Sequence, residues 1–374
     1  MERGKISKRQ LFILMLLFEL GSSIVINLGM QAKQDAWLAV LLGTGAGVCL
    51  FLVYDYLYHQ YEGLPLTQYV RSILGKYLGS LLALLYIFYF FYLSARVLRD
   101  FGDLLLTSTL EATPMLVINS MLMLVIGGAV YYGLEVVGRT GEIILPFMIF
   151  LALITGIAIL FSHIFHIKNL LPVLEGGWKP VMKATFPLTV TFPFGEIIVF
   201  SMILPYVNEQ AHTKKTGVKA ILISGFILIT TIITNIAVLG VAQASTEQFP
   251  LLTTVGKINV GDFIQRVDAV ALSALILGGF FKISIFFYAG INGMKDLFLI
   301  QKKKHILILV ASFVAVVTVY SVNMDSSFTS HIEIGLKQVP YYLHIPFQIG
   351  IPVLLLVITW GKKLGKKPSP GRIT

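Results

Sequence analysis

The chain has 374 residues, of which 56% are hydrophobic and only 13% are charged, and its formal net charge is +10. With a mean hydropathy of +0.82, its apolar content exceeds what one soluble core could bury, which excludes an ordinary soluble enzyme and predicts a polytopic membrane protein. The single cysteine, Cys49, lies inside an apolar run, so a disulfide-framed domain is excluded as well.

Ten apolar stretches are long enough to cross a bilayer as helices, since a crossing takes about 20 mainly apolar residues. In chain order, they lie between Arg9 and Lys33, Asp35 and Asp55, Lys76 and Arg96, Glu111 and Glu135, Glu142 and Lys168, Lys183 and Glu209, Lys219 and Glu247, Asp268 and Lys295, Lys304 and Asp325, and Lys337 and Lys362. The first, sixth and eighth each contain one charge, namely Glu19, Glu196 and Lys282. The connections are too short for a soluble domain. We therefore predict an all-α integral membrane protein with a single transmembrane domain over residues 1–374.

The basic residues predict which side faces the cytoplasm, because Lys and Arg collect in short cytoplasmic loops. With the N-terminus inside, 19 of the 29 Lys and Arg residues fall on the cytoplasmic side and 8 on the other side. Both termini are therefore expected in the cytoplasm, including a basic tail over residues 363–374. The positive net charge reflects this bias together with some affinity for membrane lipid, and it implies no nucleic-acid partner.

Two of the interrupted stretches contain helix-breaking residues near the bilayer centre. The first reads LFELGSSIVINLG, in which Gly21, Ser22 and Ser23 follow Glu19, and the sixth reads FPLTVTFPFGEIIVF. Proline removes a helical hydrogen bond and glycine weakens a helix, and freed backbone groups at this depth are tolerated only against protein or a water-filled cavity. A kink that merely shapes packing also explains either break taken alone.

The two breaks lie five helices apart in a chain of ten. That is the pattern of two inverted five-helix repeats with a ligand site at the midplane of the membrane. We therefore predict a LeuT-type 5+5 fold with broken helices 1 and 6. Repeat one covers about residues 8–163 and repeat two about residues 184–362.

Three motifs stand out: TFPFGE in helix six, RVDAVALSALILGGFFKISIFFYAGINGMKD in helix eight, and the cytoplasmic GLEVVGRTGEIILP at 133–146. With the length and the ten stretches, they resemble the endospore germination permease family over essentially the whole chain. These proteins are the B subunits of germinant receptors, within the amino acid, polyamine and organocation transporter superfamily. The resemblance implies a sensor of small nutrients in the inner membrane of the spore, working with an A subunit and a lipoprotein C subunit.

The breaks also predict a ligand site. Helix N-termini expose amides that favour an anion, and C-termini expose carbonyls that favour a cation, so a zwitterionic amino acid fits between them. We place its carboxylate at the amides of residues 21–23 and its ammonium at the carbonyls of residues 191–194, although core packing also explains buried aromatic residues here. The candidate ligand-binding residues are Gly21, Ser22, Ser23, Tyr89, Leu93, Thr191, Phe192, Phe194, Gly195 and Phe281.

Three charges lie deep in the apolar stretches, where a charge is costly and is by default a functional hypothesis. Glu19 and Glu196 are candidates either to carry a coupling proton or to neutralise Lys282. Sodium-coupled members of the wider fold have a cation site between helices one and eight. Our hypothesis is that Lys282 occupies this site, donating to carbonyls near Gly21 and to Glu19, and so holds helix one against helix eight without sodium. The alternative is a lysine that reaches an interface or a water-filled vestibule.

Motifs for catalysis or metal binding are missing from the sequence. It contains no nucleophile, HExxH or Walker motif, and its seven histidines are scattered over loops and helix ends. We therefore expect no enzyme activity, no cofactor and no metal site.

Three functions remain open at this point. The chain is a ligand-sensing receptor subunit, which the resemblance favours, or a proton-coupled amino acid permease, which the same fold and site would serve. The third alternative is an ion-conducting or structural membrane component, in which the breaks line an ion path and bind no nutrient.

Overall fold

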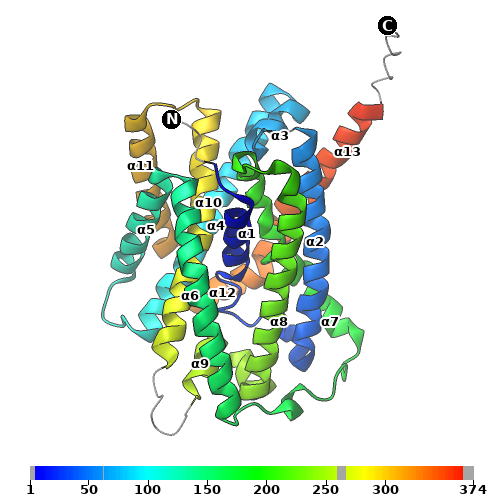
Figure 1. Cartoon of the computed structure of the whole chain (residues 1–374), viewed down its shortest axis with the longest axis vertical. Helices are drawn as coiled ribbons and strands as arrows, with labels where there is room; N and C mark the ends of the chain where they lie inside the picture. Colours follow the sequence, from blue (N-terminus) through cyan, green and yellow to red (C-terminus); the bar gives the residue numbers. More distant parts are fainter. Residues whose placement is uncertain (1–4, 62, 259–266, 365–374) are drawn as a thin grey trace.

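The computed structural model describes residues 5–61, 63–258 and 267–364, and these residues form a bundle of helices (Figure 1). Within those ranges there is no β-strand, and one isolated bridge joins Ile6 to Val207. The prediction of an all-α protein is therefore confirmed for the described residues. From residue 365 onward, the predicted basic tail lies outside them.

The described chain is a succession of α-helices joined by short 3-10 and π-helical segments. The α-helices are α1 (Lys8–Leu20), α2 (Ala36–Gln60), α3 (Leu66–Leu74), α4 (Lys76–Ser108), α5 (Met115–Tyr132), α6 (Leu134–Phe161), α7 (Trp178–Ala184), α8 (Thr213–Thr246), α9 (Pro250–Gly256), α10 (Val267–Leu297), α11 (Lys303–Asn323), α12 (Phe328–Glu333) and α13 (Ile351–Leu364). The segments that bear on the site are the 3-10 helices η1 (Met30–Asp35) and η4 (Phe194–Met202) and the π-helices η3 (Thr185–Thr189), η7 (Ile334–Gln338) and η8 (Pro340–Gly350).

Nine helical stretches within the described residues are long and apolar enough to cross a membrane. They are Met30–Gln60, Lys76–Ser108, Met115–Tyr132, Leu134–Phe161, Trp178–Met202, Gln210–Thr246, Ala271–Leu297, Lys303–Asn323 and Pro340–Lys362. These stretches coincide with the second to tenth predicted crossings and make the chain an integral membrane protein. The first predicted crossing differs.

That first crossing contains a shorter helix. α1 has 13 residues and begins with a capping box, in which the side chains of Ser7 and Gln10 each accept from the other's backbone amide. It ends at Leu20, and the residues that follow form turns in which Ser23 Oγ donates to the Glu19 carbonyl. The helix ends here because glycine weakens it and serine hydroxyls compete for its carbonyls.

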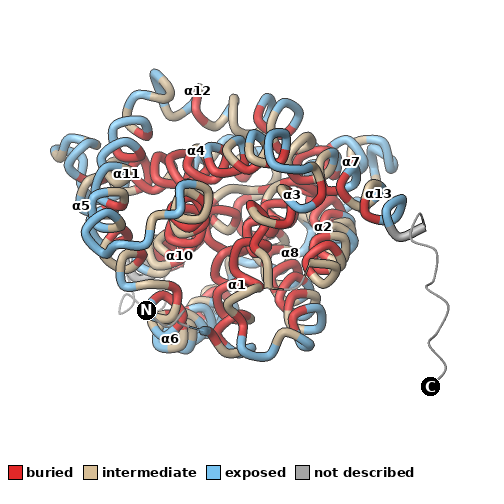
Figure 2. The backbone as a smooth tube through the Cα atoms, turned by 90° about the horizontal axis from the view of Figure 1, so that it is seen from above, coloured by how far each residue is buried: buried red, intermediate tan, exposed pale blue. Residues whose placement is uncertain are grey.

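α1 lies at the centre of the molecule. Its buried turns are enclosed by other helices when the bundle is seen from above (Figure 2), and it contacts α6, α8 and α10. At the periphery, α5 and α6 present exposed apolar side chains, with Met121 65% exposed, Leu124 67% and Leu153 61%. Such a surface suits lipid, whose tails are as apolar as leucine.

Two glycines let α2 approach the sixth apolar stretch closely. A Cβ on Gly43 would lie 2.9 Å from the carbonyl oxygen of Thr189, and a Cβ on Gly47 would lie 2.4 Å from Cβ of Phe194. Small residues four positions apart allow this contact between backbones. α2 therefore fixes the position of η3 and η4, which carry the candidate site.

Candidate functional site

The sixth apolar stretch changes its helical form at the TFPFGE motif. α7 continues into the π-helix η3, residues 192 and 193 form a turn, and η4 begins at Phe194. Pro187 and Pro193 have no amide hydrogen, so a regular α-helical ladder cannot pass through them. Here the Thr191 hydroxyl donates to the Pro187 carbonyl at 2.9 Å.

The end of α1 and the later part of η4 meet in the core. The rings of Phe18 and Phe200 pack edge to face with centroids 5.3 Å apart. Lys282 of α10 lies against the same place, since a Cβ on Gly21 would be 2.8 Å from Cβ of Lys282. The first, sixth and eighth apolar stretches, which the sequence marks by their interior charges, are therefore neighbours.

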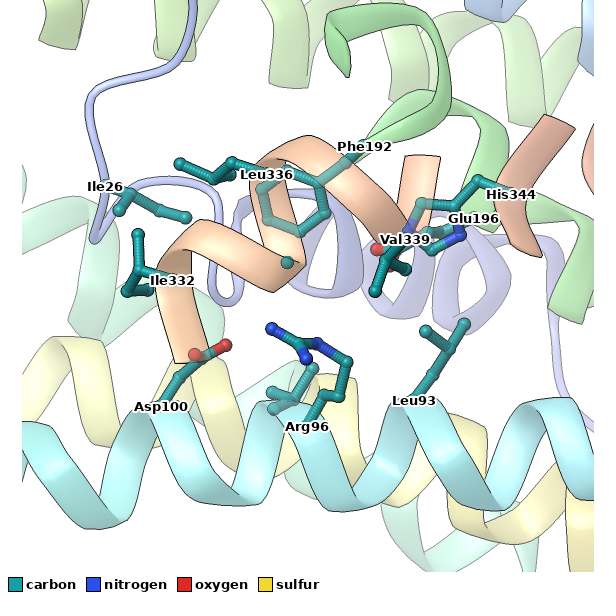
Figure 3. A pocket seen from close by; sticks show the side chains of 12 residues that line it. Ile26, Leu93, Arg96, Asp100, Phe192, Glu196, Ile332, Leu336, Val339 and His344 are labelled. Carbon is teal, nitrogen blue, oxygen red and sulfur yellow. The ribbon is translucent and has the colours of Figure 1, made fainter. Parts of the chain in front are cut away.

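A small cavity lies beside these segments (Figure 3). Its volume is about 40 Å³, enough for roughly three water molecules. The lining residues come from the segment after α1, from α4, from the TFPFGE region and from the stretch between α12 and η8. They are Ile26, Leu93, Arg96, Val97, Asp100, Phe192, Glu196, Ile332, Gly335, Leu336, Val339 and His344.

Arg96 is the basic group of the cavity. Its guanidinium points inward from α4 (Figure 3), donates from Nη2 to the His331 carbonyl at 2.8 Å, and lies 3.8 Å from Oδ2 of Asp325. Gly335 leaves room for it, because a Cβ there would be 2.2 Å from Nη2. The His331 ring is fully buried and lies 2.6 Å from Asp325 and 2.9 Å from Asp100. These contacts tie α12 to α4 at one end of the cavity.

Glu196 is one of two acidic residues that line the cavity, and the other is Asp100. Oε2 of Glu196 lies 2.6 Å from Nζ of Lys282, and both side chains are almost completely buried. The rings of Phe192 and Phe18 have their centroids 4.6 and 5.1 Å from the same nitrogen, close enough for cation–π attraction. Neither carboxylate oxygen of Glu19 has a hydrogen-bond partner among the described residues. The structure therefore pairs Lys282 with Glu196 rather than with Glu19.

Next to Glu196, a buried polar network joins α4 to η8. The Tyr89 hydroxyl lies 2.7 Å from Nδ1 of His344 and accepts from Nε2 of Gln348 at 2.8 Å. The absence of a side chain at Gly195 makes room for Gln348, whose Oε1 would be 2.2 Å from a Cβ at that position. Tyr54 completes the contact by donating to the Gln348 carbonyl at 2.6 Å.

The predicted ligand-binding residues divide into two groups in the structure. Leu93 and Phe192 line the cavity together with Glu196, and Tyr89 lies one turn from Leu93 on α4. The others do not line it and are buried: Gly21, Ser22, Ser23, Thr191, Phe194, Gly195 and Phe281. Phe194 packs on α2 at Gly47, and Phe281 packs edge to face on Phe280 with ring centroids 5.1 Å apart.

Sequence reasoning missed the polar residues of the cavity. The third predicted crossing ends at Arg96 because this charge closes the apolar gap, but α4 continues to Ser108 and buries Arg96. Arg96 and Asp100 lie one and two turns beyond Leu93, so extending the predicted face of that helix would have found them. His344 had no signal of its own, since its partner Tyr89 is 255 residues away.

Comparison with known proteins assigns the chain to a family. A family model described as "Spore germination protein" matches residues 5–329. The chain belongs to the spore germination protein family. The family match includes both interruptions, Arg96 and Glu196, and it ends before the η7 and η8 residues of the cavity.

Individual members of the spore germination protein family match more of the chain. Spore germination protein KB of Bacillus subtilis (strain 168) is 40% identical over 371 residues, which is 99% of each chain. Spore germination protein YndE of the same organism is 29% identical over 90% of each chain, and spore germination protein B2 is 25% identical over 89%. The similarity to protein KB therefore extends through the whole cavity, and the family resemblance read from the motifs is confirmed.

Proposed function

We propose that this protein is the ligand-binding membrane subunit of a spore germinant receptor and senses an amino acid. The observation that carries the proposal is the cavity, which is partly open and is lined by a guanidinium and carboxylates together with apolar side chains. Arg96 supplies the guanidinium, Glu196 and Asp100 supply the carboxylates, and Leu93 is one of the apolar residues. A small zwitterion is complementary to this arrangement.

The charges of the cavity favour one orientation of the ligand. Arginine binds carboxylates with paired hydrogen bonds, so the ligand's carboxylate faces Arg96 and its ammonium faces Glu196 and the carbonyls near Phe192. This orientation replaces the amides of residues 21–23 as the carboxylate partner, because those residues do not line the cavity. A cavity of about 40 Å³ takes a larger ligand only when the stretch between α12 and η8 moves.

The proposal includes a LeuT-type architecture. In this architecture the two inverted repeats are residues 8–163 and residues 184–362. The break of helix 1 is the turn after α1, and the break of helix 6 is the turn at residues 192 and 193. The central position of α1 and its contact with η4 support this architecture. Both termini face the cytoplasm, the membrane is the inner membrane of the spore, and an A subunit and a lipoprotein C subunit are the partners.

Filling the cavity is expected to abolish ligand binding. Leu93→Trp places an indole in the cavity, whereas Leu85→Trp, on the same helix, places it at a position that is 44% exposed. Each of the twenty amino acids is added to the purified protein and the midpoint of thermal unfolding is measured, because a ligand that binds only the folded state raises it. We expect at least one amino acid to stabilise the parent and Leu85→Trp but not Leu93→Trp. No stabilisation of the parent would contradict an amino acid sensor.

The buried charges at Glu19, Glu196 and Lys282 favour a second candidate, a proton-coupled amino acid permease. Uptake of the stabilising amino acid into proteoliposomes separates the two, with an imposed proton gradient and without partner subunits. For a receptor subunit we expect binding with no accumulation above equilibrium. Accumulation that follows the proton gradient would instead establish the permease, and ion conduction without amino acid binding would establish the third function, an ion-conducting component.

A further inference from the structure

The core contains an unbalanced cluster of buried charges. Glu19 and Lys282 are 0% exposed and Glu196 is 2% exposed. Lys282 Nζ forms an ion pair with Glu196 at 2.6 Å, whereas Glu19 has no ion-pair partner among the described residues, and neither its two oxygens nor the hydroxyl of Ser22 has a hydrogen-bond partner there. Two carboxylates and one ammonium carry a net negative charge if all three are ionised.

Other charged groups do not balance Glu19. On the cavity side, Arg96 is bonded to the His331 carbonyl, and Asp100 lies against the His331 ring. On α6 and α8, the charged groups facing α1 lie near its start, where Glu142 accepts from Gln10 and Lys219 lies over the ring of Phe12. A buried carboxylate without a partner is so costly that it neutralises itself by binding a proton.

We propose that Glu19 is a proton-binding site whose occupancy is coupled to the ligand. In the ligand-free arrangement Glu19 holds one proton and Lys282 is paired with Glu196. A ligand ammonium that reaches Glu196 from the cavity releases Lys282, which turns to Glu19, and Glu19 releases its proton to solvent. Both ammonium groups keep their protons, so the cluster is neutral before and after the exchange. The ligand step rests on the proposed function, whereas the proton on Glu19 does not.

The packing around Lys282 suits such an exchange. Its stem runs along Gly21, where a Cβ would be 2.8 Å from Cβ and 3.0 Å from Cδ of the lysine, and Gly21 is two residues from Glu19. The two phenylalanine rings beside Nζ stabilise an ammonium without fixing it by hydrogen bonds. Glu196 lines the cavity and is therefore the member of the cluster that a ligand reaches first.

Infrared difference spectroscopy of the purified protein at neutral pH tests the proton site without any ligand. Protonated carboxyl groups give a C=O stretch that carboxylates lack. We expect the parent spectrum to contain one such band that is absent from the spectrum of Glu19→Gln, which lacks the carboxyl group. The band should also be lost in Glu196→Gln, in which Lys282 becomes free to pair with an ionised Glu19. Lys282→Met should double the intensity of the band, because the carboxyls of Glu19 and Glu196 are then both protonated.

These variants make the proton site falsifiable even if Lys282→Met does not fold. Glu333→Gln changes a glutamate whose side chain is 58% exposed and should leave the band unchanged. If the spectrum of Glu19→Gln contains every protonated-carboxyl band of the parent, Glu19 holds no proton and the proposed proton site is wrong. A band that survives in Glu196→Gln would show that Lys282 does not exchange between the two carboxylates.

Proton release on ligand binding tests the coupling. The amino acid that stabilises the parent most is titrated into the protein in weak buffer, and we expect about one proton to be released per ligand bound. In Glu19→Gln the released Lys282 has no second carboxylate to pair with, so we expect the same amino acid to bind much more weakly than it binds to the parent. Binding without proton release in the parent overturns the coupling. If no amino acid binds, the proposed function and the coupling both fail, and the infrared result still decides the proton site.

Discussion

Lys282→Met is expected to lower the free energy of unfolding by about 3–5 kcal/mol at neutral pH, the usual cost of removing one partner of a buried ion pair. The ammonium of Lys282 is 2.6 Å from Glu196, and neither side chain reaches solvent. Removing it leaves the buried carboxylate of Glu196 without a cation. Glu196 can then become neutral only by binding a proton, so the cost should be smaller in acid. Unfolding in mixed micelles at neutral and acidic pH measures both effects.

Two further variants distinguish the cost of breaking a buried ion pair from the cost of breaking an exposed one. Lys337→Met breaks an exposed pair, in which Lys337 lies 2.9 Å from Glu333 with both side chains more than half exposed, and should cost less than about 1 kcal/mol. The double variant Lys282→Met/Glu196→Gln removes both charges of the buried pair and should recover most of the loss. A Lys282→Met protein as stable as the parent would mean that Glu196 has another partner.

The sequence was sufficient for the membrane class and for nine of the crossings because both follow from the spacing of charges in an apolar chain. It also marked the three stretches that meet in the core, since Glu19, Glu196 and Lys282 each interrupt one of them. A charge at that depth must find a partner or lose its charge, so the proximity of Lys282 to one of the two glutamates was predictable. Which glutamate it contacts depends on the angle between η4 and α10, which no local pattern encodes.

The polar end of the cavity was not predictable by the same rule. Counting gaps between charges treats Arg96 as the end of a helix, but its guanidinium is satisfied by the His331 carbonyl and by Asp325, more than 200 residues further along the chain. The stretch 328–350 likewise has the hydropathy of a loop followed by a crossing. Its short helix α12 and its π-helices depend on contacts with α4, and these contacts place Leu336, Val339 and His344 on the cavity.

Arg96→Gln is expected to open the cavity by weakening the contact between α12 and α4. The charged hydrogen bond to the His331 carbonyl, at 2.8 Å, is the shortest that Arg96 makes across this contact, and hydrogen bonds to charged groups contribute about 1.5–3 kcal/mol. Leu336→Cys, in a Cys49→Ala background, reports the opening because Leu336 lines the cavity and is only partly exposed. A population shift of this size corresponds to a thiol labelling rate about ten- to a hundredfold higher in Arg96→Gln.

Lys337→Gln provides the matched control for that measurement. Lys337 is next to Leu336 in the chain, but its side chain is 67% exposed and pairs with Glu333 at the end of α12, so its loss should leave the labelling rate unchanged. If Arg96→Gln also leaves the rate unchanged, Arg96 does not hold α12 against α4, and the ligand must enter from another side. If the rate rises and the stabilising amino acid still binds with full affinity, Arg96 closes the cavity without binding the carboxylate. A higher labelling rate together with a large loss of affinity for the amino acid is the expected result if the Arg96 guanidinium both holds α12 against α4 and binds the ligand carboxylate.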